Sequence, residues 1–185
     1  MSKQQCVVLG VTGSIAAYKA AELVRLFKAD GRDIWVVMTE AATRFVGELT
    51  FRTLSQHPVA VQMFNDGDEW CPEHISLADR ADVMVVAPCT ANVLAKMAHG
   101  LADDLLSCTA LACSAPIVVA PAMNEKMWDN AATADNVAAL KARGVQIVEV
   151  GTGDLACGYQ GRGRMAPPAD IVGAVNGILG EPKAS

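Results

Sequence analysis

The sequence predicts an α/β fold in which a parallel sheet lies between helices in a doubly wound arrangement. Apolar runs such as residues 82–88 and 115–120 are nearly continuous, which is typical of parallel strands buried on both faces. Helical patterns alternate with these runs, and this order predicts βαβ units with right-handed crossovers. Since 52% of the 185 residues are hydrophobic, there is enough apolar material for one closed core.

Each element has a local signal in the sequence. A first strand at 5–10 leads into a helix at 15–29, whose polar residues recur every three positions and leave an apolar side for the sheet. Further strands are predicted at 33–38, 82–88, 115–120 and 145–148. Further helices are predicted at 41–46, 50–54, 75–79, 93–98 and 105–112, from the motif at 121–128 to residue 143, and at 169–179. We therefore expect one domain over residues 1–180 and a tail at 181–185.

Charge and cysteine usage exclude several classes of protein. The net charge is −5, and the basic residues are scattered, so nothing indicates a nucleic-acid or membrane surface. No apolar run reaches the about 18 residues of a spanning helix, and residues 1–5 run directly into a strand, so we expect a cytoplasmic protein without a signal peptide. The six cysteines show no zinc-site spacing, and we expect no metal.

The first turn, at residues 10–14, predicts an anion site. Gly13 and Ser14 would present backbone N–H groups and a hydroxyl at the start of a helix. The spacing is neither G-x-G-x-x-G nor a Walker A loop, so a single phosphate fits better than a pyrophosphate. The alternative is that the turn only caps the helix.

Polar groups also follow the other strands. Thr39, Thr90 and Asn92 come after the second and third long strands, and Asn124 comes after the next one. Because the carboxyl ends of parallel strands meet at one edge of the sheet, these groups should surround one ligand. The set has no basic side chain and no metal cluster, and it suits flavin mononucleotide (FMN) better than a nicotinamide dinucleotide.

Asn124 lies between Met123 and Met127 in the motif Pro-Ala-Met-Asn-Glu-Lys-Met-Trp at 121–128. Its neutral amide could hold a carboxylate that must later be lost, because a full cation would stabilise the ionised acid too well. The alternative is a helix N-cap at Asn124, with Met123, Met127 and Trp128 in the core. His74 precedes a strand near the sheet edge, whereas we expect His57 in solvent.

Residues 151–165 are unusually rich in glycine and contain Cys157, Arg162 and Arg164. A long glycine-rich loop in a compact domain is usually a functional lid or a disordered linker. The Arg-Gly-Arg sequence and the embedded cysteine favour a lid. We therefore predict a loop at 151–166 that closes over a ligand.

The chain resembles the homo-oligomeric flavin-containing cysteine decarboxylases over residues 5–178. The resemblance is carried by Gly-Ser-Ile-Ala at 13–16, the histidine at 74, Ala-Pro-Cys-Thr-Ala-Asn at 87–92, the 121–128 motif and Ala-Cys-Gly-Tyr-Gln-Gly-Arg-Gly-Arg-Met at 156–165. Within the family, the motifs are most similar to those of the phosphopantothenoylcysteine decarboxylase branch. The family more often has Ala-Ser where this chain has Cys89-Thr90; the hydroxyl is kept, so flavin binding should survive.

The resemblance implies a Rossmann-like flavoprotein fold and a role for each matching residue. Gly13, Ser14 and Ile15 would hold the FMN phosphate, with Thr39, Thr90, Ala91, Asn92, Val93 and Ala122 around the rest of the cofactor. Asn124 would hold the substrate carboxylate, and Met127, Asp154, Arg162 and Arg164 would contact the substrate. His74 would act in an oxidation step and Cys157 would give a proton in the final reduction. The family also implies trimers, often assembled into dodecamers, with the active site between subunits.

The implied reaction is decarboxylation of 4′-phosphopantothenoylcysteine to 4′-phosphopantetheine in coenzyme A biosynthesis. The thiol-bearing carbon is oxidised to a thioaldehyde, carbon dioxide leaves to give an ene-thiol, and reduction completes a redox-neutral cycle. The alternatives are a peptidyl-cysteine decarboxylase of lantibiotic type and a non-catalytic FMN-binding regulatory subunit. A phosphopantothenoylcysteine synthetase is a possible partner, because such domains are often fused to this one.

Overall fold

The computed structural model describes residues 4–64, 73–154, 158 and 160–180. Six strands form one parallel sheet in the order β3-β2-β1-β4-β5-β6. They are β1 (Cys6–Val11), β2 (Asp33–Met38), β3 (Val59–Ala60), β4 (Val83–Cys89), β5 (Ile117–Pro121) and β6 (Gln146–Ile147). The predicted doubly wound α/β fold is confirmed, and the strand order is that of a Rossmann-like sheet.

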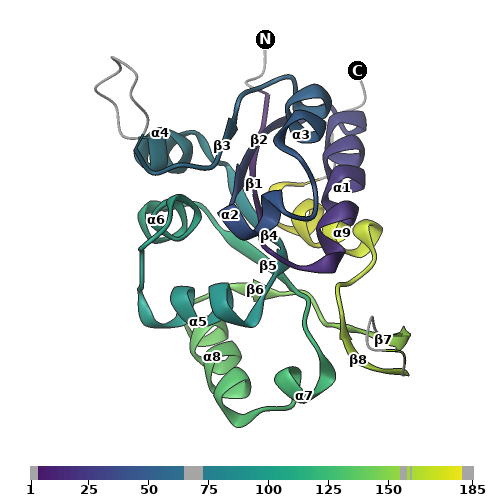
Figure 1. Cartoon of the computed structure of the whole chain (residues 1–185). Helices are drawn as coiled ribbons and strands as arrows, with labels where there is room; N and C mark the ends of the chain where they lie inside the picture. Colours follow the sequence, from purple (N-terminus) through teal and green to yellow (C-terminus); the bar gives the residue numbers. More distant parts are fainter. Residues whose placement is uncertain (1–3, 65–72, 155–157, 159, 181–185) are drawn as a thin grey trace.

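Helices cover both faces of this sheet (Figure 1). They are η1 (Ile15–Ala17), α1 (Tyr18–Ala29), α2 (Glu40–Thr43), α3 (Glu48–Ser55), α4 (Glu73–Arg80), α5 (Ala91–His99), α6 (Leu105–Ala112), α7 (Glu125–Trp128), α8 (Ala131–Ala142) and α9 (Pro168–Leu179). One core cluster joins α1, α3 and α9 to the sheet, and Phe27, Phe51 and Ile171 are fully buried in it. The second joins α4, α5, α6 and α8 to the opposite face. Among the described residues, no helix is both long and apolar enough to cross a bilayer.

Two predictions of secondary structure were wrong. The single helix expected from the 121–128 motif to residue 143 is two helices, because Asn130 accepts the N–H of Ala132 and starts α8 afresh. The segment predicted as a loop forms two antiparallel strands, β7 (Gly151–Asp154) and β8 (Gln160–Arg164). In Figure 1 these strands project from the sheet as a separate ribbon beside the end of β5.

His57 was also expected in solvent, but it is part of a cluster. Its Nε2 lies 2.7 Å from Oδ1 of Asp33, and its ring stacks on Trp35 with 4.1 Å between ring centroids. The Arg80 guanidinium lies 4.0 Å from the centre of the Trp35 ring. The cluster ties the start of β2 to the end of α4.

Candidate functional site at the carboxyl edge of the sheet

The ends of β1 and β4 are joined by a residue that the sequence analysis overlooked. Thr12 is fully buried, donates its hydroxyl to the carbonyl of Pro88 at 2.7 Å, and accepts the N–H of Thr90 at 3.0 Å. These bonds hold the Gly13–Ser14 turn beside the start of α5. The sequence does show a hydroxyl directly after a strand. Threonine is also common in turns, so this signal alone does not predict a bond between two strand ends.

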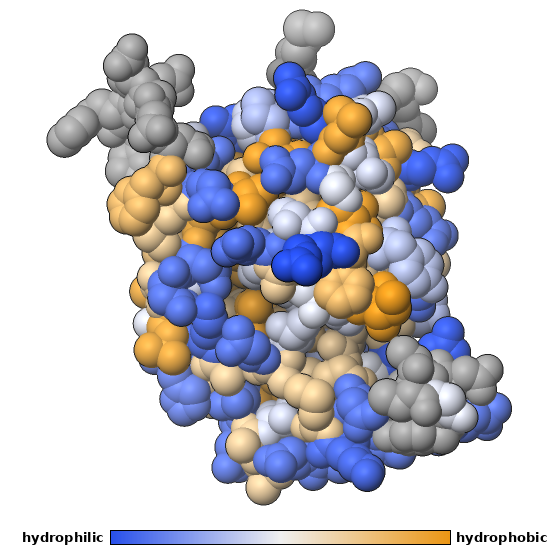
Figure 2. Space-filling model, in the orientation of Figure 1, coloured by the Kyte–Doolittle hydropathy of each residue, from blue (hydrophilic) through white to orange (hydrophobic). Residues whose placement is uncertain are grey.

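A cavity of about 420 Å³ opens where these strand ends meet. From the predicted cofactor set, the residues that line it are Gly13, Ser14, Ile15, Thr90, Ala91 and Ala122. Its wall is mostly apolar, and Figure 2 shows neutral and hydrophobic residues just below the centre of this face of the molecule. The structure therefore brings three of the predicted strand-end segments, those after β1, β4 and β5, together around one opening.

Three members of the predicted cofactor set do not line this cavity. The Thr39 hydroxyl accepts the N–H of Ala42 and caps α2. Asn92 is exposed on the first turn of α5, and the side chain of Val93 is buried in the core. Thr39 and Asn92 can contact a bound ligand only if the ligand extends beyond the walls of this cavity. Val93 can do so in the same way or through its backbone.

The local structure of Asn124 combines both interpretations of its motif. The residue caps α7, because its Oδ1 accepts the N–H of Lys126 at 2.9 Å. It also lines the cavity together with Met123 and Met127, and 48% of the Met127 surface is exposed. Only the nitrogen of an asparagine amide can donate to a carboxylate, and the cap fixes the orientation of this amide at the cavity.

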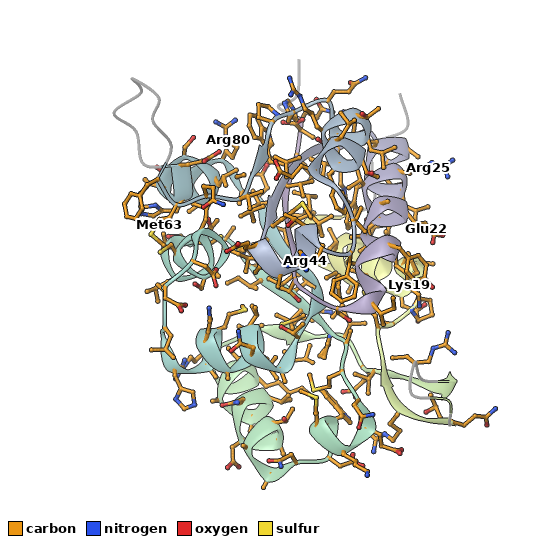
Figure 3. All side chains as sticks on the ribbon, viewed as in Figure 1. Lys19, Glu22, Arg25, Arg44, Met63 and Arg80 are labelled. Atoms are coloured by element: carbon orange, nitrogen blue, oxygen red, sulfur yellow. The ribbon has the colours of Figure 1, made fainter. Side chains whose placement is uncertain are left out.

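Two cationic side chains lie at the rim of the cavity, and one of them, Lys19, was not predicted to be there. Arg164, on β8, and Lys19, on the first turn of α1, both line the cavity. Burial and the nearby Arg164 guanidinium lower the pKa of the Lys19 ammonium, while Glu22 acts in the opposite direction. Figure 3 shows Lys19 at the end of α1 nearest to β7 and β8, with Glu22 and Arg25 further along the helix.

The other predicted substrate residues have mixed positions. Arg162 is exposed on β8, and its backbone N–H bonds to Glu125 at 3.0 Å. Asp154 ends β7 opposite Gln160. His74 is half-buried on the first turn of α4 and does not line the cavity. Cys157 lies outside the described residues.

Cys89, which departs from the pattern of the resembling family, is fully buried at the end of β4. Burial raises the pKa of its thiol well above the usual range. A buried, protonated thiol behaves as a small hydrophobic side chain. The departure therefore alters the core below the cavity and leaves Thr90 at the cavity wall.

Comparison with known proteins decides the family. Residues 1–180 match the family described as Flavoprotein. The chain belongs to this family. Among curated relatives of this flavoprotein, the coenzyme A biosynthesis bifunctional protein CoaBC of Bacillus subtilis (strain 168) is 45% identical over 172 residues, which are 93% of this chain and 42% of that protein. The flavoprotein chain therefore spans less than half the length of the curated relatives that it matches first.

Two solved structures are similar over nearly the whole flavoprotein chain. A mutant PPC decarboxylase complexed with pantothenoylaminoethenethiol has a TM-score of 0.84 and 32% identity, covering 94% of this chain and 97% of that one. The FMN binding protein AtHal3 has a TM-score of 0.81 and 34% identity, covering 99% and 100%. These matches confirm the resemblance inferred from the motifs.

Proposed function

We propose that this chain catalyses the FMN-dependent decarboxylation of 4′-phosphopantothenoylcysteine to 4′-phosphopantetheine. The carrying observation is that one cavity is lined by the Gly13–Ser14 turn, by Asn124 and by Arg164. These groups match three parts of the chemistry: a cofactor phosphate, a substrate carboxylate and a substrate phosphate. The names of the similar proteins support the same assignment.

The residues at the cavity fit FMN. The Ser14 hydroxyl, at the start of a helix, suits a single phosphate. The Ser14 N–H, which the sequence also offered to this anion, instead donates to the carbonyl of Thr12 at 2.8 Å. Ala91 and Ala122 are small enough to leave a flat space for a ring, and Thr90 adds a hydroxyl at the wall. The remaining members of the set, Thr39, Asn92 and Val93, are proposed to contact the parts of FMN that extend beyond the cavity. When bound, FMN supplies reversible two-electron oxidation of the substrate.

Asn124 is proposed to bind and orient the substrate carboxylate. The N–H of Lys126 donates to its amide oxygen and fixes the orientation of the amide, whose nitrogen is the donor that would face the carboxylate. A neutral donor stabilises the ionised acid less than a lysine or arginine would. The carboxylate is thereby positioned without being made too stable to leave.

Lys19 and Arg164 are proposed to bind the substrate phosphate. Both line the cavity, where burial and then the Arg164 guanidinium lower the pKa of Lys19. An anion between the two cations would relieve their repulsion. Phosphate binds well to such a pair because charge-assisted hydrogen bonds are stronger than neutral ones. Arg162, Asp154 and Met127 are proposed to contact the rest of the substrate.

His74 and Cys157 are proposed to handle protons, His74 in the oxidation and Cys157 in the final reduction. His74 does not line the cavity of its own chain, so we infer that a second copy supplies it. The exposed apolar residues Ile15 and Tyr18, at the cavity, give that copy a surface to cover. A trimer, or a dodecamer built from trimers, is the proposed assembly, with an identical neighbouring subunit completing each site.

The cellular setting is proposed on the same grounds. Residues 1–180 would act as one domain, in the cytoplasm, with a phosphopantothenoylcysteine synthetase as fusion or partner.

The substrate test is direct: the purified, FMN-loaded protein is mixed with 4′-phosphopantothenoylcysteine and with a peptide that ends in cysteine. Carbon dioxide release from the small thiol alone supports the proposal. Release from the peptide alone would favour a peptidyl-cysteine decarboxylase, and release from neither would favour a regulatory subunit.

A further inference from the structure

β8 is held directly against the loop that carries Asn124. The backbone N–H of Met123 donates to the carbonyl of Gly163 at 3.0 Å. The backbone N–H of Arg162 donates to Oε1 of Glu125, also at 3.0 Å. One of these bonds depends on a side chain, so it can be removed by substitution without altering the backbone.

The alternation of residues in β8 allows this close approach. Gly161 and Gly163 are buried, whereas Arg162 and Arg164 are exposed on the other side of the strand. A Cβ on Gly161 would lie 2.7 Å from Oε2 of Glu125, and a Cβ on Gly163 would overlap the carbonyl oxygen of Met123. The strand is therefore shaped to receive the Glu125 carboxylate on its glycine side.

The contact is one of several restraints on the position of Arg164, together with the pairing of β8 with β7. Met165 and Ala166 are buried in the core and fix the chain after β8. Glu125 holds the strand two residues before Arg164. Arg164 lines the cavity, and its guanidinium lies over Gly153 of β7, where a Cβ would overlap it. The guanidinium is also near enough to Lys19 to contribute, after burial, to the lowered pKa of that ammonium.

We propose that Glu125 is a positioning residue, whose bond to the Arg162 N–H places the Arg164 guanidinium opposite Lys19 to receive the phosphate of a phosphorylated substrate. Glu125 does not line the cavity, so it acts through β8 rather than on the substrate. The identity of the phosphorylated substrate in this inference rests on the proposed function. The role of Glu125 in placing β8 does not depend on it.

The test compares Glu125→Ala, Glu125→Gln and the control Asp135→Ala, which removes an exposed carboxylate from α8. KM is measured for 4′-phosphopantothenoylcysteine and for pantothenoylcysteine, which lacks the phosphate. Glu125→Ala should raise KM for the phosphorylated substrate about tenfold and leave kcat and the other KM within about twofold. Glu125→Gln keeps an acceptor oxygen and should recover most of the loss, and Asp135→Ala should change neither KM.

In the Arg164→Gln background, Glu125→Ala should add no further loss, because both changes remove the same contact. Equal KM changes for the two substrates, or additive losses, would overturn the proposal.

Amide exchange at Met123 and Arg162 provides a second measurement that needs no turnover. We expect both amides to exchange faster in Glu125→Ala but not in Asp135→Ala. Unchanged exchange would show that Glu125 does not hold β8 in place. If the wild-type protein turns over neither substrate, the proposed function and the phosphate role fail, and exchange still decides whether Glu125 holds β8.

Discussion

Arg164, on β8, and Lys19, on α1, line the same cavity, and burial together with the Arg164 guanidinium lowers the pKa of the Lys19 ammonium. Two cations at one cavity repel each other unless an anion lies between them. The proposal that this pair binds the substrate phosphate therefore predicts a preference for phosphorylated over unphosphorylated substrate.

Removing Lys19 should weaken binding of the phosphorylated substrate selectively. We expect Lys19→Gln to raise KM for 4′-phosphopantothenoylcysteine about 10- to 100-fold, the range for losing one charge-assisted hydrogen bond, with little effect on pantothenoylcysteine. Steady-state kinetics with both substrates measures this. Arg25→Gln, further along α1 and exposed, is the matched control. A parallel rise in KM for both substrates would contradict a phosphate role.

The pH dependence of KM should reflect the same ammonium. Because burial and Arg164 lower the Lys19 pKa, the ammonium loses its proton at a lower pH than an ordinary lysine. KM for the phosphorylated substrate should therefore begin to rise with pH below the usual lysine value of about 10.4. Lys19→Arg keeps its charge throughout this range and should give a flat profile. A rising profile that persists unchanged in Lys19→Arg would assign the titration to another group.

Asn124→Asp should abolish turnover while the protein stays folded and loaded with FMN. Aspartate caps helices as well as asparagine, so α7 should persist. A carboxylate facing the substrate carboxylate adds repulsion of several kcal/mol, so kcat/KM should fall at least about 100-fold. Carbon dioxide release and the flavin absorbance spectrum measure the two properties. Turnover near the wild-type rate would remove the carboxylate role from Asn124.

His74→Asn should prevent bleaching of the flavin by substrate, and co-expression with Asn124→Asp should restore part of the activity. If each site takes His74 from one copy and Asn124 from another, about a quarter of the sites in a random mixture carry both native residues. Activity of the co-purified mixture tests this against each variant alone. A mixture as inactive as its parents would place both residues in the same subunit or outside the mechanism.

The pair of Asp33 and His57 should affect acid stability. Burial raises the pKa of Asp33, but the bonds from His57 and Trp35 outweigh it, and the net pKa is lowered. The stabilisation is therefore present above the unfolded pKa of about 3.9 and is lost as pH falls through the lower folded value. Asp33→Asn should destabilise the protein at pH 7 by about 0.2–1 kcal/mol and flatten the loss of stability in this acid range. Urea unfolding at several pH values measures the free energy of unfolding of both proteins. The same slope of this free energy against pH in wild type and Asp33→Asn would contradict the prediction.

The sequence predicted the sheet and much of the cavity because buried strands and the groups that follow them have local signals. Asn124 and the Gly13–Ser14 turn were found in this way. β7 and β8 were missed because glycine has low strand propensity, and here it serves close approach to residues 123–125. Lys19 was assigned to a solvent face by its three-residue spacing, since spacing does not show which end of α1 meets the cavity.

The central claim is best tested by mixing the FMN-loaded protein with 4′-phosphopantothenoylcysteine under anaerobic conditions, with no added reductant. We predict carbon dioxide and 4′-phosphopantetheine in equal amounts over many turnovers, with the flavin returning to its oxidised spectrum when substrate is exhausted. Flavin that stays oxidised throughout, with no carbon dioxide released, would contradict the account.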